Sequence, residues 1–176
     1  MNTKTKKLST VSIVLCGMFA ALVAIGAFIQ IPVPYMDYFT LQFFFVLLAG
    51  LILGADKGAI SVGCYVLLGL VGVPIFAAGG GIGYIFRPSF GYLVGFIVSA
   101  YVTGKVCEKL KASYKNYLLA CLAGFVVTYA IGIVYKFIIL NFYAHTPATL
   151  GVIFLSCFPL DMPGDFVLCL LAAGVG

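Results

Sequence analysis

The stretch from Leu118 to Tyr143 reads LLACLAGFVVTYAIGIVYKFIILNFY and carries a single charged residue, Lys136. A helix needs about 20 mostly apolar residues to cross the hydrocarbon core of a bilayer. This stretch is long enough, and apolar enough, to do so. It predicts an integral membrane protein built from α-helices.

The composition of the whole chain agrees with this prediction. Of its 176 residues, 64% are hydrophobic and 9% are charged, with a mean hydropathy of +1.20. An ordinary soluble domain has about 25% charged residues. So few polar groups exclude a soluble enzyme, a nucleic-acid-binding module and a disordered tail. The length supplies roughly six spans, so we expect one transmembrane domain over residues 1–176 and no room for a nucleotide-hydrolysing domain.

Prolines, glycines and short polar turns divide the chain into apolar segments. A glycine-rich stretch over 74–86 is a poor helix by propensity, and a short apolar segment lies in a loop over 145–160. The six expected spans are Leu8–Ile31, Phe39–Leu53, Ala59–Val71, Pro88–Val106, Leu118–Tyr143 and a last one beginning at Pro163.

Lys and Arg gather on the cytoplasmic side of membrane proteins. With a cytoplasmic amino terminus and six crossings, eight of the ten cations fall inside, in the amino-terminal segment, at Lys57 and in the linker 105–117. Both termini are therefore expected in the cytoplasm. Arg87 and Lys136 fall near the outer side, as does His145, which we interpret as a loop residue.

Three outer features are candidates for binding a small molecule. The glycines around Gly80 and Gly81 form either a flexible outer loop or backbone lining a cavity, where their N–H groups could hold an anion. No Gly-Lys-Ser/Thr follows them, which excludes a nucleotide-binding P-loop. Arg87 is either a headgroup anchor or a ligand contact, and Lys136 either snorkels outward or contacts substrate.

Asp165 follows Pro163 and Gly164 at the start of the last span. It either caps the helix or accepts hydrogen bonds from a ligand, and the two roles are compatible. The sequence shows no serine elbow and no aspartate pair on facing spans, so no catalytic residue is assigned. The six cysteines have no metal-like spacing, and we expect neither a metal nor a cofactor.

Gly17, Ala20, Ala21 and Ala24 place small side chains three and four apart on the first span. Such residues let a second helix approach closely. They favour packing inside the bundle or docking on another membrane protein.

Several motifs resemble the BioY family, the biotin-specific substrate-binding subunits of energy-coupling-factor (ECF) importers. They are FTLQ at 39–42, LLAGLILG at 47–54, GLVGVPIFA at 69–77, RPSFGYLVGF at 87–96 and PGD at 163–165. The resemblance implies six helices, biotin near the outer side, and a bacterial cytoplasmic membrane. It also implies docking through Ala20 and Ala24 on an EcfT-type coupling protein that works with a pair of ABC ATPases.

For the site, the resemblance implies that Asp165 accepts from the ureido group of biotin, while Gln42 helps through its amide and Tyr92 lines the wall. Family members often carry a lysine where this chain has Leu168 and a glycine where it has Arg87. We therefore expect Arg87, with the amides of Gly80 and Gly81, or Lys136, to hold the carboxylate. The alternatives are a self-sufficient secondary carrier and a subunit for another small vitamin.

Overall fold

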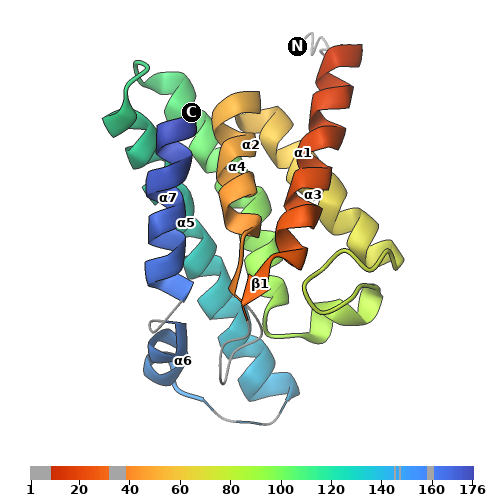
Figure 1. The fold of residues 1–176 in the computed structure, drawn as a ribbon. Coiled ribbons are helices and arrows are strands. Elements are labelled where there is room, and N and C mark those ends of the chain that lie inside the picture. Colours follow the sequence, from red (N-terminus) through yellow and green to blue (C-terminus); the bar gives the residue numbers. More distant parts are fainter. Residues whose placement is uncertain (1–8, 32–38, 145, 147, 158–160) are drawn as a thin grey trace, which may run out of the picture.

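The computed structural model describes residues 9–31, 39–144, 146, 148–157 and 161–176, and these form a helical bundle. The helices α1, α2, α3, α4, α5 and α7 run along its length in alternating directions, while the short α6 lies at one end (Figure 1). The α-helices are α1 Thr10–Phe28, α2 Gln42–Leu53, α3 Ala55–Val71, α4 Phe90–Lys109, α5 Tyr114–Ile138, α6 Leu150–Cys157 and α7 Asp161–Val175.

Three helical stretches are long and apolar enough to cross a membrane: α1, α4, and the continuous run Tyr114–Tyr143, in which α5 extends into the π-helix η2 Ile139–Tyr143. Taking α6 and α7 together as one bent span gives four. The remaining lengthwise helices, α2 and α3, have 12 and 17 residues. The expectation of an all-helical membrane protein is confirmed, but length and composition alone give fewer spans than six.

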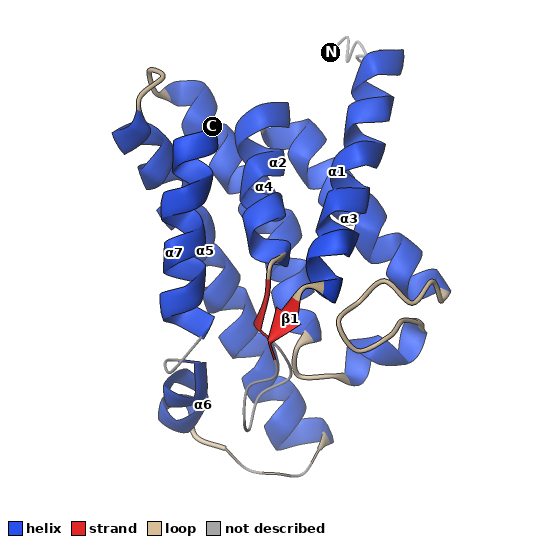
Figure 2. Ribbon diagram, viewed as in Figure 1, coloured by secondary structure: helices blue, strands red, loops and turns tan. Residues whose placement is uncertain are grey.

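The second expected span is wrong at its start. Phe39–Thr40 is a short strand, β2, which pairs antiparallel with β1, Gln30–Ile31 (Figure 2). The N–H of Leu41 donates to the carbonyls of Gly26 and Ile29, so the chain is held against the end of α1 before α2 begins. Leu8, the expected start of the first span, lies outside the described residues.

The glycine-rich stretch is a folded loop followed by the 3₁₀-helix η1, Ile82–Phe86. Gly79 and Gly81 have φ of 108° and 102°, a backbone region that other residues rarely adopt. The N–H of Gly81 donates to the carbonyl of Gly69 at 2.7 Å, which ties the loop back onto α3. The loop is therefore closely packed on the bundle.

Small residues let α4 and α5 approach one another closely. A Cβ added to Gly95 would lie 3.0 Å from the carbonyl oxygen of Thr128, and one added to Gly124 would lie 2.6 Å from Ser99 Oγ. A Cβ at Gly132 would lie 2.5 Å from the ring of Tyr92. Small residues repeated every four positions allow such contact between membrane helices, so this helix pair forms a tightly packed scaffold.

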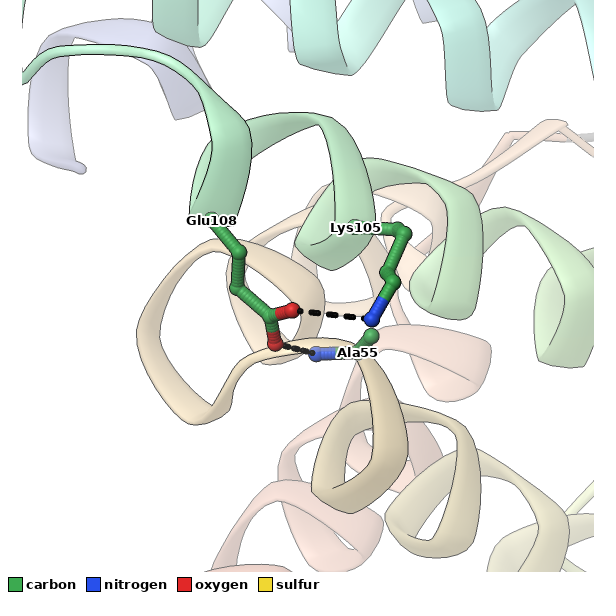
Figure 3. A network of polar contacts seen from close by, with 3 residues as sticks. All are labelled: Ala55, Lys105 and Glu108. Carbon is green, nitrogen blue, oxygen red and sulfur yellow. Dashed lines mark hydrogen bonds and ion pairs between the residues drawn. The ribbon is translucent and has the colours of Figure 1, made fainter.

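The start of α3, which contains Lys57, and the turn between α4 and α5 lie at the end of the bundle that holds the carboxyl terminus (Figure 1). Most of the basic linker expected over 105–117 is helical, because α4 ends at Lys109 and α5 begins at Tyr114. At this end α4 closes onto the α2–α3 turn (Figure 3). Glu108 Oε1 accepts from the N–H of Ala55 at 3.0 Å, and its Oε2 lies 3.4 Å from Lys105 Nζ. A carboxylate at the start of a helix satisfies a free N–H group and complements the helix dipole.

Candidate functional site

A cavity of about 610 Å³ opens at the end of the bundle opposite the carboxyl terminus. Its wall comes from β2, the start of α2, η1 and the loop before it, the segment from Pro88 into α4, the second half of α5 with η2, α6 and the start of α7. Aromatic side chains make up much of this wall: Phe39, Phe43, Tyr84, Tyr92, Phe96 and Tyr129. Apolar walls with a few placed polar groups are typical of small-molecule sites.

Asp165 is one of these polar groups. Its Oδ2 accepts a hydrogen bond of 2.8 Å from the hydroxyl of Tyr129 on α5. Helix α7 begins at Asp161, so it is Asp161, not Asp165, that stands in the first turn. The capping role considered for Asp165 is therefore wrong, and its carboxylate instead faces the cavity.

Among the residues that the structure describes, Lys136 is the one cation that lines the cavity. Its Nζ lies 3.4 Å from Ser156 Oγ on α6, and that hydroxyl donates to the carbonyl of Ile153 at 2.6 Å. The lysine is half-buried. The Lys136 side chain therefore lies along the cavity wall and does not snorkel away from the bundle.

Gln42 begins α2 and is 3% exposed. Its Oε1 accepts from the Thr40 hydroxyl at 3.2 Å, and its Nε2 donates to the hydroxyl of Tyr65 at 2.5 Å. Gln42 and Thr40 both line the cavity, whereas Tyr65 stands behind them. The Gln42 amide is therefore hydrogen-bonded at both its oxygen and its nitrogen. Its remaining hydrogen-bonding capacity is available to a ligand.

Tyr92 and Ser89 come from the first part of the segment RPSFGYLVGF. Tyr92 lies edge-on to Tyr129, with ring centroids 5.8 Å apart, and its hydroxyl lies 3.1 Å from Cys157 Sγ. The buried hydroxyl of Ser89 has no hydrogen-bond partner within the described part of the chain. An unpaired buried hydroxyl is costly, so Ser89 is suited to bond a molecule in the cavity.

Gly80, Gly81 and Arg87 do not line this cavity. Arg87 is exposed, and its Cζ lies 5.3 Å from the ring centroid of Tyr84. This distance fits a cation–π contact. Because Tyr84 itself lines the cavity, Arg87 is one side chain away from it.

The small residues of α1 separate into two faces. Ala20 is 7% exposed and belongs to the core, and Ala24 is half-buried against it. Gly17 and Ala21 are exposed, and a Cβ added to Gly17 would meet nothing within 4 Å. The outward small-residue face is therefore formed by Gly17 and Ala21.

Sequence reasoning missed Tyr129, Thr40, Ser89 and Ser156. A signal existed for Tyr129, which precedes Lys136 by seven positions and so lies on the same face of a helix. The others depend on how β2, the start of α4 and α6 meet, which spacing along the chain does not give. No group of three or more metal-ligating side chains occurs among the described residues.

Known proteins resemble this chain over most of its length. The probable biotin transporter BioY of Lysinibacillus sphaericus is 40% identical over 96% of this chain and 86% of its own. The biotin transporter BioY of Thermotoga maritima is 45% identical over 73% of each chain. A crystal structure of the S-component for biotin from an ECF-type ABC transporter superposes with a TM-score of 0.82, covering 99% of this chain and 92% of that one, at 24% identity. The sequence model of the BioY family matches residues 1–176, and the chain belongs to the BioY family.

Proposed function

We propose that this chain binds biotin at the outer side of a bacterial cytoplasmic membrane and delivers it inward as the S component of an ECF-type importer. The relatives at 40% and 45% identity are named as biotin transporters, and the similar fold is that of a biotin S-component. Binding and release of the vitamin need no bond to be made or broken.

The observation that carries the proposal is the placement of an acidic and a basic side chain along the cavity. Asp165 is bonded to Tyr129, and Lys136 follows Tyr129 by seven residues, or about 10 Å along the helix axis. Biotin has a ureido ring with two N–H donors, an apolar middle and a carboxylate. We assign the ureido end to Asp165, the carboxylate to Lys136, and the middle to the aromatic wall.

The proposed orientation follows the charge. Lys57, in the first turn of α3, and the cations at the end of α4, in the α4–α5 turn and at the start of α5 share one end of the bundle with the carboxyl terminus, and the cavity lies at the other. Cations favour the cytoplasmic side, which puts the cavity outside. Six crossings with both termini in the cytoplasm fit the alternating course of α1 to α5 and α7.

Partners for release into the cell are supported by the similar fold, which is that of an S-component from an ECF-type ABC transporter. We propose a transmembrane coupling protein and a pair of ABC ATPases. The exposed face of α1 around Gly17 and Ala21 is our candidate for contact with the coupling protein, because small residues allow close helix approach.

Calorimetry on the purified chain in detergent tests the proposal. Biotin is expected to bind at one site without any other subunit, whereas riboflavin and thiamine give no heat of binding. Binding of another vitamin but not of biotin would overturn the assignment of biotin as the ligand. Accumulation of biotin by liposomes holding this chain alone would instead indicate a self-sufficient carrier.

A further inference from the structure

Tyr65 supports the cavity wall from outside the cavity. It is fully buried on α3 and is not among the lining residues. Its hydroxyl accepts from Gln42 Nε2 at 2.5 Å and donates to the carbonyl oxygen of Ile75 at 3.1 Å. Ile75 belongs to the glycine-rich loop between α3 and η1. One phenol thus joins the cavity residue Gln42 to that loop.

These two bonds fix the orientation of the Gln42 amide. A tyrosine hydroxyl has one proton, and a backbone carbonyl can only accept. The proton of Tyr65 is therefore used by Ile75, and the lone pairs of its oxygen face Gln42. The amide must present its NH₂ group to Tyr65, which turns Oε1 toward the hydroxyl of Thr40. A flipped amide would set two acceptors against each other at Tyr65.

The fixed orientation of the Gln42 amide determines which hydrogen-bonding groups this part of the cavity wall presents to a ligand. The proton of Thr40 is used by Gln42, so the free capacity of Thr40 and of Gln42 Oε1 is that of acceptors. Phe39, next to Thr40, lies against Gly164, next to Asp165. Helix α2, which Gln42 begins, also packs against α7, so the acceptors of Gln42 and of Thr40, which bonds it, lie in the part of the wall next to the Asp165 carboxylate.

We propose that Tyr65 is a positioning residue for biotin recognition: it locks the Gln42 amide so that acceptors face the ureido N–H groups, and it fastens the glycine-rich loop through Ile75. This inference rests on the proposed binding of biotin. The ligand itself does not touch Tyr65.

Tyr65→Phe keeps the ring, which packs edge-on against Phe76, and removes only the hydroxyl. We expect biotin to bind about five- to tenfold more weakly, in keeping with the loss of one hydrogen bond. Tyr135→Phe is the matched control, because Tyr135 also donates to a backbone carbonyl, that of Ile85, but bonds no cavity residue. Its affinity for biotin should stay within twofold of wild type.

A double-mutant cycle separates positioning from general stability. In the Gln42→Ala chain, Tyr65→Phe should change the biotin dissociation constant by less than twofold, since there is no amide left to orient. An equal loss in both backgrounds, or no loss in either, would overturn the positioning role.

Amide hydrogen exchange without ligand tests the link to the loop. Exchange over residues 73–80 should be faster in Tyr65→Phe than in wild type or Tyr135→Phe, and equal rates would overturn the link. If the wild-type chain fails to bind biotin, the proposed function fails and the recognition role falls with it, while hydrogen exchange still decides the loop attachment.

Discussion

Lys136 and Arg87 offer a test of which cation meets the ligand carboxylate. Lys136→Gln should weaken the binding of biotin by about 10- to 100-fold, because a charge-assisted hydrogen bond contributes roughly 1.5 to 3 kcal/mol. The binding of the neutral methyl ester of biotin should be weakened much less. Calorimetry with both ligands measures the difference.

Arg87→Gln is the matched control, since Arg87 is exposed over Tyr84 and outside the cavity. Its effect on biotin should be small and equal for acid and ester. If the Arg87 variant lost affinity for biotin but not for its methyl ester, and the Lys136 variant showed no such selective loss, the assignment would be reversed.

Asp165 should behave differently from both cations. Asp165→Asn keeps the shape but halves the acceptor capacity of the side chain, so biotin and its methyl ester should weaken by the same factor, about tenfold or more. Titration of the two ligands into this variant measures the factors. Weakening confined to the acid would mean that Asp165 does not meet the ureido end.

The sequence predicted the residue types of the site better than their arrangement. Gln42, Tyr92, Lys136 and Asp165 all line the cavity, as expected of binding residues. Arg87 does not, because the turn after η1 directs it over Tyr84. Hydropathy and motif spacing report which residues are near the outer side, but the direction of a side chain depends on the local backbone, which they do not report.

At the scale of helices, the contact between α4 and α5 positions the aromatic wall. Gly132→Ala would place a Cβ 2.5 Å from the Tyr92 ring, so the ring must shift. Overpacking of this kind costs about 1 to 3 kcal/mol. We expect a lower thermal unfolding midpoint and weaker biotin binding together.

Gly63→Ala on α3 is the control, because a Cβ there meets nothing within 4 Å. Alanine is the better helix former, so this variant should be as stable as wild type or more so, with unchanged affinity. Equal destabilisation of both variants would argue against close packing as the cause.

The outward face of α1 predicts which substitution blocks docking. Ala21→Trp should prevent co-purification with the coupling protein and stop uptake, while biotin affinity of the isolated chain stays unchanged. Ala20→Trp should instead lower the thermal stability of the isolated chain, because Ala20 is in the core. Normal assembly of the Ala21 variant would exclude this face as the docking surface.

The sequence predicts the helices well where an apolar composition determines them. It predicts them less well where contacts between segments of the chain determine the local structure. The stretch 118–143 is helical throughout, in agreement with its apolar run. The apolar segment that begins at Phe39 predicts a helix, yet Phe39 and Thr40 pair with Gln30 and Ile31 as strands. Such a pairing involves residues eight or ten positions apart and leaves no periodic signal in a segment this short.

For the whole molecule, the proposed topology puts the α4–α5 linker inside the cell and the end of η2 outside. In a chain whose native cysteines are replaced by alanine, Lys111→Cys should be protected from an impermeant maleimide in whole cells, and Phe142→Cys should be labelled. Both residues are exposed in the structure. The opposite pattern would invert the orientation, and labelling of both or neither would contradict an odd number of crossings between them.

The aromatic wall also gives the protein an unusual optical property. The chain has 11 tyrosines and no tryptophan, so its ultraviolet emission comes mainly from tyrosine. Tyr84, Tyr92 and Tyr129 face the cavity. A single tryptophan at Phe96, whose ring stacks on Phe43 at 5.9 Å, would be the only indole in the molecule. Its emission wavelength would report water entering or leaving the cavity, and so follow a filling and emptying cycle in real time without a label on the vitamin.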